Sequence, residues 1–147
     1  MTYEEAMQAI QPGRYRHFKG NTYEVIGIAK HSETEEPMVV YRALYGEGGL
    51  WVRPADMWNE QITRDGKTYH RFYHMDRIER VDKYERLFDE AATSLDPEEL
   101  RLLGVYYTSG EWQEDYEADE RGDLPPDLKR GVLSQDALYD LLEGAGL

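Results

Sequence analysis

The chain has 147 residues, and its 17 lysine and arginine against 30 aspartate and glutamate residues give a net charge of −13. That length fits one ordinary domain or two small ones. No cysteine is present, so disulfide bonds, thiolate catalysis and cysteine-ligated zinc sites are excluded. The chain also lacks an apolar signal segment and any run of about 18 apolar residues, so we expect a cytoplasmic protein without membrane contact.

The negative charge is concentrated in the second half of the chain. Residues 1–80 hold 11 basic and 12 acidic residues, a balance of −1, whereas residues 81–147 hold 6 and 18, a balance of −12. We expect the acidic half to repel nucleic acid, while the near-neutral half retains the ability to bind an anion locally. The asymmetry predicts two modules, which we place at residues 1–74 and 75–147.

A short helix followed by several short strands is predicted in the first module. Thr2 and Glu5 form a capping-box pattern, and Pro12 and Gly13 end the helix near Ile10. Segments rich in β-forming residues follow, separated by turn residues, at about 13–18, 22–31, 37–45, 50–53, 61–63 and 68–73. Five or six short strands at this spacing predict a small closed or half-closed β-barrel.

The second module is predicted to be helical. From Met75 the period of the apolar residues changes from two to between three and four. Asp96 and Ser134 are expected to be N-caps, and Pro97 to occupy the first helical position after Asp96. Two further helices are expected over residues 111–120 and 135–143. The predicted fold class is α+β, with a small barrel after a short helix and an acidic helical module after the barrel.

The segment from Leu50 to Pro54 carries the main candidate for a binding site. Trp51 and Arg53 are two residues apart on a predicted strand, so their side chains share a face. An indole beside a guanidinium suits a planar or anionic group. In the alternative, Trp51 packs the barrel mouth and Arg53 bridges to a carboxylate. The candidate ligand-binding residues are Arg16, His17, Tyr41, Trp51 and Arg53.

A second candidate is the segment from Arg14 to Lys19, which alternates basic and ring-bearing side chains. Such a strand could hold single-stranded nucleic acid by base stacking and phosphate contact. We favour a plainer interpretation, an edge strand with one solvated charged face.

No metal site, cofactor site or catalytic nucleophile is predicted. Asp115, Glu117 and Asp119 have the spacing of an EF-hand start, but Glu120 stands where glycine is required. The acidic residues from Glu111 to Asp123 are therefore expected to form a solvated helix face. His70 and His74 fall at a strand end without a zinc-binding helical pattern. The patch from Lys129 to Ser134 is expected to pair with these acids, rather than bind an anion at the start of the last helix.

Residues 12–73 resemble the family DUF1653, which implies an SH3-like barrel. The matching residues are Pro12 to Gly20, Tyr23 to Val25, His31 to Glu33, Val40 to Tyr45, Trp51 to Pro54, and Arg71 with Phe72. Residues 106–143 resemble a second family, DUF4298, through Tyr106 and Tyr107, Ser109 to Glu117, Leu124 and Pro125, Asp127 to Ser134, Asp136, and Tyr139 to Leu142. Neither resemblance implies an activity or a substrate.

We therefore expect a non-catalytic binding protein. Its barrel mouth would take a peptide, a nucleotide or another anionic ligand, and its helical module would contact a protein or regulate access. Two alternatives stay open. One is a small enzyme with His17 as general base and Arg53 as anion clamp. The other is a single-stranded nucleic-acid binder. The sequence predicts no oligomeric state.

Overall fold

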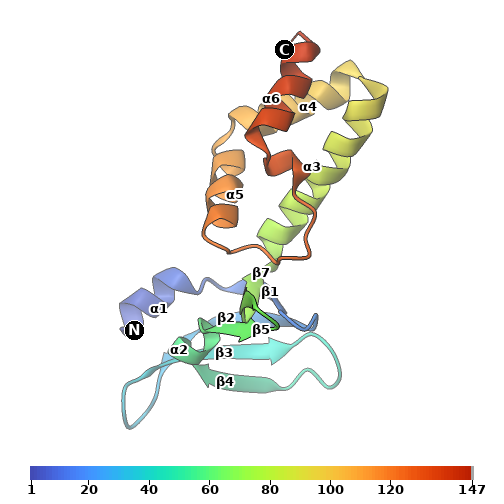
Figure 1. Cartoon of the computed structure of the whole chain (residues 1–147). Coiled ribbons are helices and arrows are strands. Elements are labelled where there is room, and N and C mark those ends of the chain that lie inside the picture. Colours follow the sequence, from blue (N-terminus) through green and yellow to red (C-terminus); the bar gives the residue numbers. More distant parts are fainter. Residues whose placement is uncertain (147) are drawn as a thin grey trace. The chain divides into compact units, whose positions relative to one another are not determined.

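The computed structural model of the protein describes residues 1–146. The chain forms two compact units, Met1–Met75 and Asp76–Leu147. The first unit is built on an antiparallel sheet, and the second consists of helices and their connections (Figure 1). The fold class is therefore α+β, as predicted. Among residues 1–146, no helix is long and apolar enough to cross a membrane.

Five antiparallel strands form the main sheet of the first unit, in the order β4-β3-β2-β1-β7. They are β1 (Gly13–His17), β2 (Thr22–Lys30), β3 (Pro37–Ala43), β4 (Leu50–Pro54) and β7 (Phe72–His74). Strands β4 and β7 are the two edges, and within the described residues they do not pair with each other. The sheet is not closed into a barrel, so the predicted SH3-like barrel is not confirmed.

The predicted last strand, residues 68–73, is divided in the structure. Strands β5 (Gln61–Arg64) and β6 (Lys67–His70) form a separate two-stranded ribbon, whereas β7 pairs with β1. The division falls at Arg71. Its backbone N–H donates to the carbonyl of Glu60 at 3.2 Å, and its carbonyl accepts from the N–H of Phe18 at 2.9 Å. Arg71 is thereby held at the point where the chain passes from the ribbon to the sheet.

Two helices contribute to the core of the first unit, α1 (Tyr3–Ala9) and the one-turn α2 (Ala55–Trp58). The Thr2 hydroxyl accepts from the N–H of Glu5 at 3.1 Å, so the predicted cap is confirmed. Helix α2 follows β4 directly and was not predicted.

Trp58 of α2 joins the two edges of the sheet through side chains. It is 3% exposed, and its ring stacks on Phe72 of β7 with centroids 3.6 Å apart. It also meets Tyr41 of β3 edge-on at 4.9 Å. Because α2 is continuous with β4, this stack links the β4 edge to the β7 edge without backbone hydrogen bonds between them. The aromatic core under the sheet therefore depends on one indole.

The second unit contains α3 (Met75–Ser94), α4 (Pro97–Thr108), α5 (Gly110–Glu120), a 3-10 turn η1 (Gly131–Leu133) and α6 (Gln135–Gly144). Both predicted N-caps are confirmed. Asp96 accepts from the N–H of Glu98 at 2.9 Å, and Ser134 accepts from the N–H of Ala137 at 3.3 Å.

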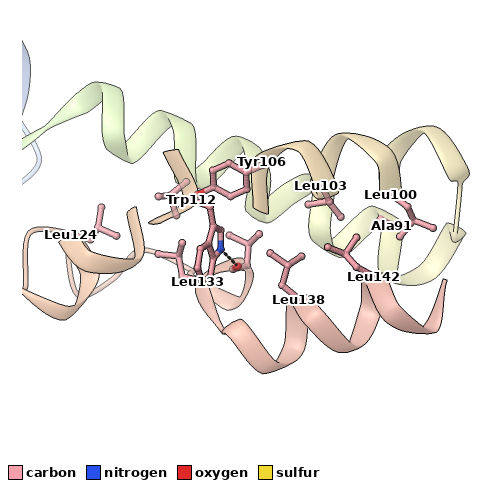
Figure 2. Packing of buried hydrophobic residues seen from close by; sticks show 11 residues of the cluster. Ala91, Leu100, Leu103, Tyr106, Trp112, Leu124, Leu133, Leu138 and Leu142 are labelled. Atoms are coloured by element: carbon pink, nitrogen blue, oxygen red, sulfur yellow. Dashed lines mark hydrogen bonds between the residues drawn. The ribbon is translucent and has the colours of Figure 1, made fainter. Parts of the chain in front are cut away.

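Apolar side chains from α3, α4, α5 and α6, with those of the segment between α5 and α6, form the core of the second unit. Figure 2 shows Leu138 and Leu142 of α6 pointing toward Leu103, Leu100 and Ala91. All five are buried, with exposed fractions of 7% or less. The helical period seen in the sequence therefore corresponds to a shared apolar face.

Two buried side chains hold the backbone of Val132 in η1. The indole N–H of Trp112 donates to its carbonyl at 3.1 Å (Figure 2). The carboxylate of Glu85, only 8% exposed, accepts from its N–H at 2.7 Å. A Cβ at the preceding Gly131 would lie 3.1 Å from Glu85 Oε1, so glycine lets the turn approach this carboxylate. Side chains of α3 and α5 thus supply the hydrogen-bond partners for the buried backbone of the irregular segment before α6.

The expectation of a solvated acidic face on α5 is wrong for Asp115, which is fully buried. Its carboxylate accepts from Nε of Arg80 at 2.9 Å, from Nη2 of Arg80 at 2.5 Å and from the hydroxyl of Tyr106 at 2.6 Å. These partners come from α3 and α4, so Asp115 joins three helices. The expected ion pair from the basic patch is present, because Arg130 binds Asp119 of α5.

Candidate functional site

The strand register decides which candidate residues share a face of the sheet. Tyr41 lies opposite Trp51 across β3 and β4, and Arg53 lies two residues further along β4 on the same face. The register through β2 places His17 of β1 on this face as well. Arg16, one residue before His17, faces the other side of the sheet. Four of the five candidate residues therefore share one face, and Arg16 does not.

His17 lies among aromatic rings on this face. Its ring centroid is 4.6 Å from that of Phe18, 5.1 Å from that of Phe72 and 6.4 Å from that of Tyr23. The hydroxyls of Tyr23 and Tyr45 form a hydrogen bond of 2.8 Å, in which either oxygen can be the donor. Three aromatic side chains thus contact the His17 ring and give it partly apolar surroundings.

The backbone determines which nitrogen of His17 carries the proton. The N–H of Lys19 donates to Nδ1 of His17 at 3.1 Å, so the lone pair of Nδ1 is in use. The neutral ring then carries its proton on Nε2, which is a hydrogen-bond donor. Burial, followed by the positive charges of Arg71, Lys19 and Arg53, lowers the pKa of His17 from its ordinary value of 6.5. At neutral pH, His17 is therefore a neutral donor with no free lone pair.

Arg53 has no counter-charge within residues 1–146. Its Nε is buried without a hydrogen-bond partner, and no carboxylate among residues 1–146 pairs with it. Arg42, on the adjacent strand and the opposite face, forms an ordinary ion pair with Glu24 at 3.2 Å. The alternative in which Arg53 bridges to a carboxylate is therefore not found in the described chain.

Arg71 is a further cation near His17 and was not among the predicted site residues. Its Nη2 binds Glu60 at 3.0 Å, while its Nε is buried without a hydrogen-bond partner among residues 1–146. We call His17, Arg53 and Arg71 the cationic cluster, because the charges of both arginines act on the His17 ring. In the sequence, only its position directly before the core residue Phe72 sets Arg71 apart.

Trp51 is 61% exposed and forms no ring contact within residues 1–146. It does not pack a barrel mouth, and Trp58 occupies the buried position instead, at 3% exposure. The indole of Trp51, which the sequence pattern singled out, is thus exposed to solvent on the same strand as Arg53.

The Tyr15 ring of the basic β1 strand does not face solvent. Tyr15 is 7% exposed and lies 5.6 Å from Trp58 and 4.8 Å from His74, measured between ring centroids. A nucleic-acid base would have to reach such a ring to stack on it. The alternating pattern of β1 therefore separates a core face from a charged face.

The second unit holds a hollow of about 380 Å³ beside Arg80. Arg80 is already bound to Asp115 and Glu111, so it offers no uncompensated charge to an anion. Nor do residues 1–146 contain a group of three or more histidine, aspartate or glutamate side chains that could hold a metal ion. The lining residues of the hollow are Asp76, Glu79, Arg80, Lys83, Tyr84 and Glu111.

Comparison with known proteins finds two families, both of unknown function. Residues 13–74 match the model of the protein family of unknown function DUF1653, and residues 75–145 match that of the domain family DUF4298. The chain is also similar to the crystal structure of a DUF1653 protein from Bordetella bronchiseptica, at 40% sequence identity and a TM-score of 0.42. That similarity covers 45% of this chain and 87% of the other. No curated protein matches. Both resemblances stated from the sequence are confirmed.

Proposed function

Because the chain joins a DUF1653 region to a DUF4298 region, both of unknown function, we propose its function from geometry. The sheet unit is a non-catalytic binding module that takes an anionic group at the cationic cluster. The observation that carries this proposal is Arg53, whose buried Nε has no partner among residues 1–146. Arg53 is partly buried, and even partial burial of an unpaired charge is unfavourable, so a site of this kind is explained when a ligand supplies the opposite charge.

The chemistry of the cationic cluster suits an anion. The Arg53 guanidinium offers a planar array of N–H donors that matches carboxylate and phosphate oxygens, and Arg71, whose Nη2 binds Glu60, adds positive charge near His17. The Nε2–H of His17 adds a donor that needs no protonation. The aromatic side chains around His17 lower the local dielectric, which strengthens these interactions.

The same geometry argues against catalysis by His17. A general base needs a free lone pair that can reach the proton it removes. In His17 the lone pair of Nδ1 accepts from Lys19, and Nε2 carries the proton. We therefore favour binding over the alternative of a small enzyme.

For the acidic helical region we propose a role in protein contact. We also propose that residues 1–74 and 75–147 act as separate modules, which is supported by the division of contacts after Met75. The SH3-like barrel stays a prediction for the first module. The stack of Trp58 on Phe72, which joins the two sheet edges, supports it.

Arg53→Met is expected to weaken binding of inorganic phosphate by at least about tenfold, because hydrogen bonds to a charged group are lost. The free energy of unfolding should rise by up to about 1 kcal/mol, since a partly buried guanidinium without a carboxylate partner is replaced by an apolar chain. Calorimetric titration at constant ionic strength and urea unfolding measure the two effects. Arg42→Met is the matched control and should leave phosphate affinity unchanged. Equal loss in both variants, or no phosphate binding by the wild type, would refute the proposed site.

The titration of His17 provides an independent test. In the free protein its pKa lies below 6.5, so the unfolded chain takes up the proton more readily. The free energy of unfolding should therefore fall as the pH drops below about 6.5. A sulfate ion at the cationic cluster would favour the imidazolium and raise this pKa, so sulfate affinity should increase with decreasing pH. NMR titration of the His17 ring with and without sulfate measures the shift. An unchanged pKa under saturating sulfate would contradict binding near His17.

A further inference from the structure

Strand β4 is an uncovered edge of the sheet (Figure 1). Three consecutive residues, Leu50, Trp51 and Val52, are 65%, 61% and 60% exposed. Successive side chains of a strand point to opposite faces, so both faces of β4 are apolar and open to solvent. Edge strands of this kind pair readily with another strand unless charges, bulges or covering segments prevent it. The single irregularity in the register of this sheet lies between β2 and β3, away from this edge.

The five residues of β4 are complementary to a second copy of themselves. Full overlap of two antiparallel strands Leu50–Pro54 requires Val52 to lie opposite the partner's Val52. Trp51 then lies opposite the partner's Arg53 on the same face, and the symmetry axis creates this contact twice. Leu50 and Val52 from both copies form an apolar strip on the other face.

The contact between Trp51 and the partner's Arg53 satisfies both side chains. Directly opposed residues have Cβ atoms about 5 Å apart, which brings a guanidinium within cation–π range of an indole. In one copy of the chain, Trp51 has no ring contact and Arg53 has no counter-charge among the described residues. Pairing across β4 gives each of them a partner.

We propose that two copies of this chain form a symmetric dimer by antiparallel pairing of β4 with the partner's β4, centred on Val52. This dimer does not depend on the proposed anion site, but it is compatible with it. A guanidinium that stacks on an indole keeps its N–H groups in its own plane, pointing away from the indole face, where an anion can bind them. The partner's Trp51 would then form one wall of the cationic cluster. Because the paired strands are short, the dissociation constant is expected to be on the order of micromolar.

Analytical ultracentrifugation of the full chain, from about 1 µM to several hundred µM, tests the dimer. Val52→Glu places two carboxylates opposite each other on the symmetry axis, and Val52→Lys places two ammonium groups there. Each variant alone should be monomeric, and an equal mixture of the two should dimerise again. Val52 is exposed, so neither change should disturb the fold. Ile26→Glu, at an exposed apolar position on the inner strand β2, is the matched control and should dimerise like the wild type.

The cross-strand contact is tested by a double-mutant cycle. Trp51→Ala and Arg53→Ala should each weaken the dimer by about tenfold, because each removes both symmetric contacts. The double variant should lose little more than either single variant. A wild type that stays monomeric throughout the concentration range, or a Val52→Glu variant that still dimerises, would overturn the proposal. A mixture of the Glu and Lys variants that stays monomeric would overturn the register centred on Val52.

Discussion

Asp115→Ala is expected to lower the free energy of unfolding of the helical unit by about 3 to 5 kcal/mol, a large part of the stability of such a unit. Asp115 is fully buried and accepts hydrogen bonds from Arg80 and Tyr106. Removing its carboxylate leaves the Arg80 charge without its main partner and the Tyr106 hydroxyl without an acceptor. Burial and this hydrogen bond raise the pKa of Tyr106, so its hydroxyl remains the donor at neutral pH.

Two variants separate the buried network from ordinary surface charge. Glu114→Ala removes the neighbouring carboxylate, which is exposed and lies 3.6 Å from Arg80, and should cost less than about 1 kcal/mol. Asp115→Asn keeps an oxygen for Tyr106 but removes the charge, so its effect should lie between the other two. Urea unfolding followed by far-ultraviolet circular dichroism measures all three. A loss below about 1 kcal/mol for Asp115→Ala would show that the network contributes little.

Local features of the fold were predictable from the sequence because their signals lie within a few residues. The N-caps at Thr2, Asp96 and Ser134 bind backbone N–H groups two or three residues away. The apolar period that begins near Met75 likewise predicted that the second unit is helical. Each of these interactions is decided by the local sequence.

The burial of Asp115 depends on distant residues and was missed for that reason. Arg80 is 35 positions away, so no local pattern marks the pair. One signal was present: Trp112, Asp115 and Ala118 repeat at three-residue spacing and are all buried. This spacing places Asp115 on the same helix face as Trp112 and Ala118, which belongs to the core. A carboxylate at such a position requires a partner.

The candidate site was only partly predictable. Alternation along the strands placed Trp51 and Arg53 on one face, but Arg16 was grouped with His17 although consecutive strand residues face opposite sides. That the charge of Arg53 acts on the His17 ring depends on the placement of β1 and β4 in one sheet, which no single strand pattern encodes. Arg71 was missed because the β-type pattern continues through it, although the pairing changes there from the ribbon to the main sheet. The one-turn helix α2 was too short to leave a periodic signal.

Trp58→Ala is expected to lower the free energy of unfolding of the sheet unit by about 3 to 5 kcal/mol. Trp58 stacks on Phe72 at 3.6 Å and contacts Tyr41 and Tyr15 edge-on at 4.9 and 5.6 Å. Its removal opens a cavity and separates the two edges of the sheet.

Trp51→Ala is the matched control for Trp58→Ala, because it removes the same side chain from a position that is 61% exposed. Measured at a protein concentration well below the dimer range, it should change the free energy of unfolding by no more than about 0.5 kcal/mol. Similar losses in the two variants would contradict the central role of Trp58. If only Trp58→Ala destabilises the unit, phosphate affinity should fall with it, because Phe72 and Tyr41 hold the face on which the cationic cluster lies. In that case the buried indole of Trp58 maintains the structure around the cationic cluster, and the exposed indole of Trp51 remains available to contact a second copy of the chain.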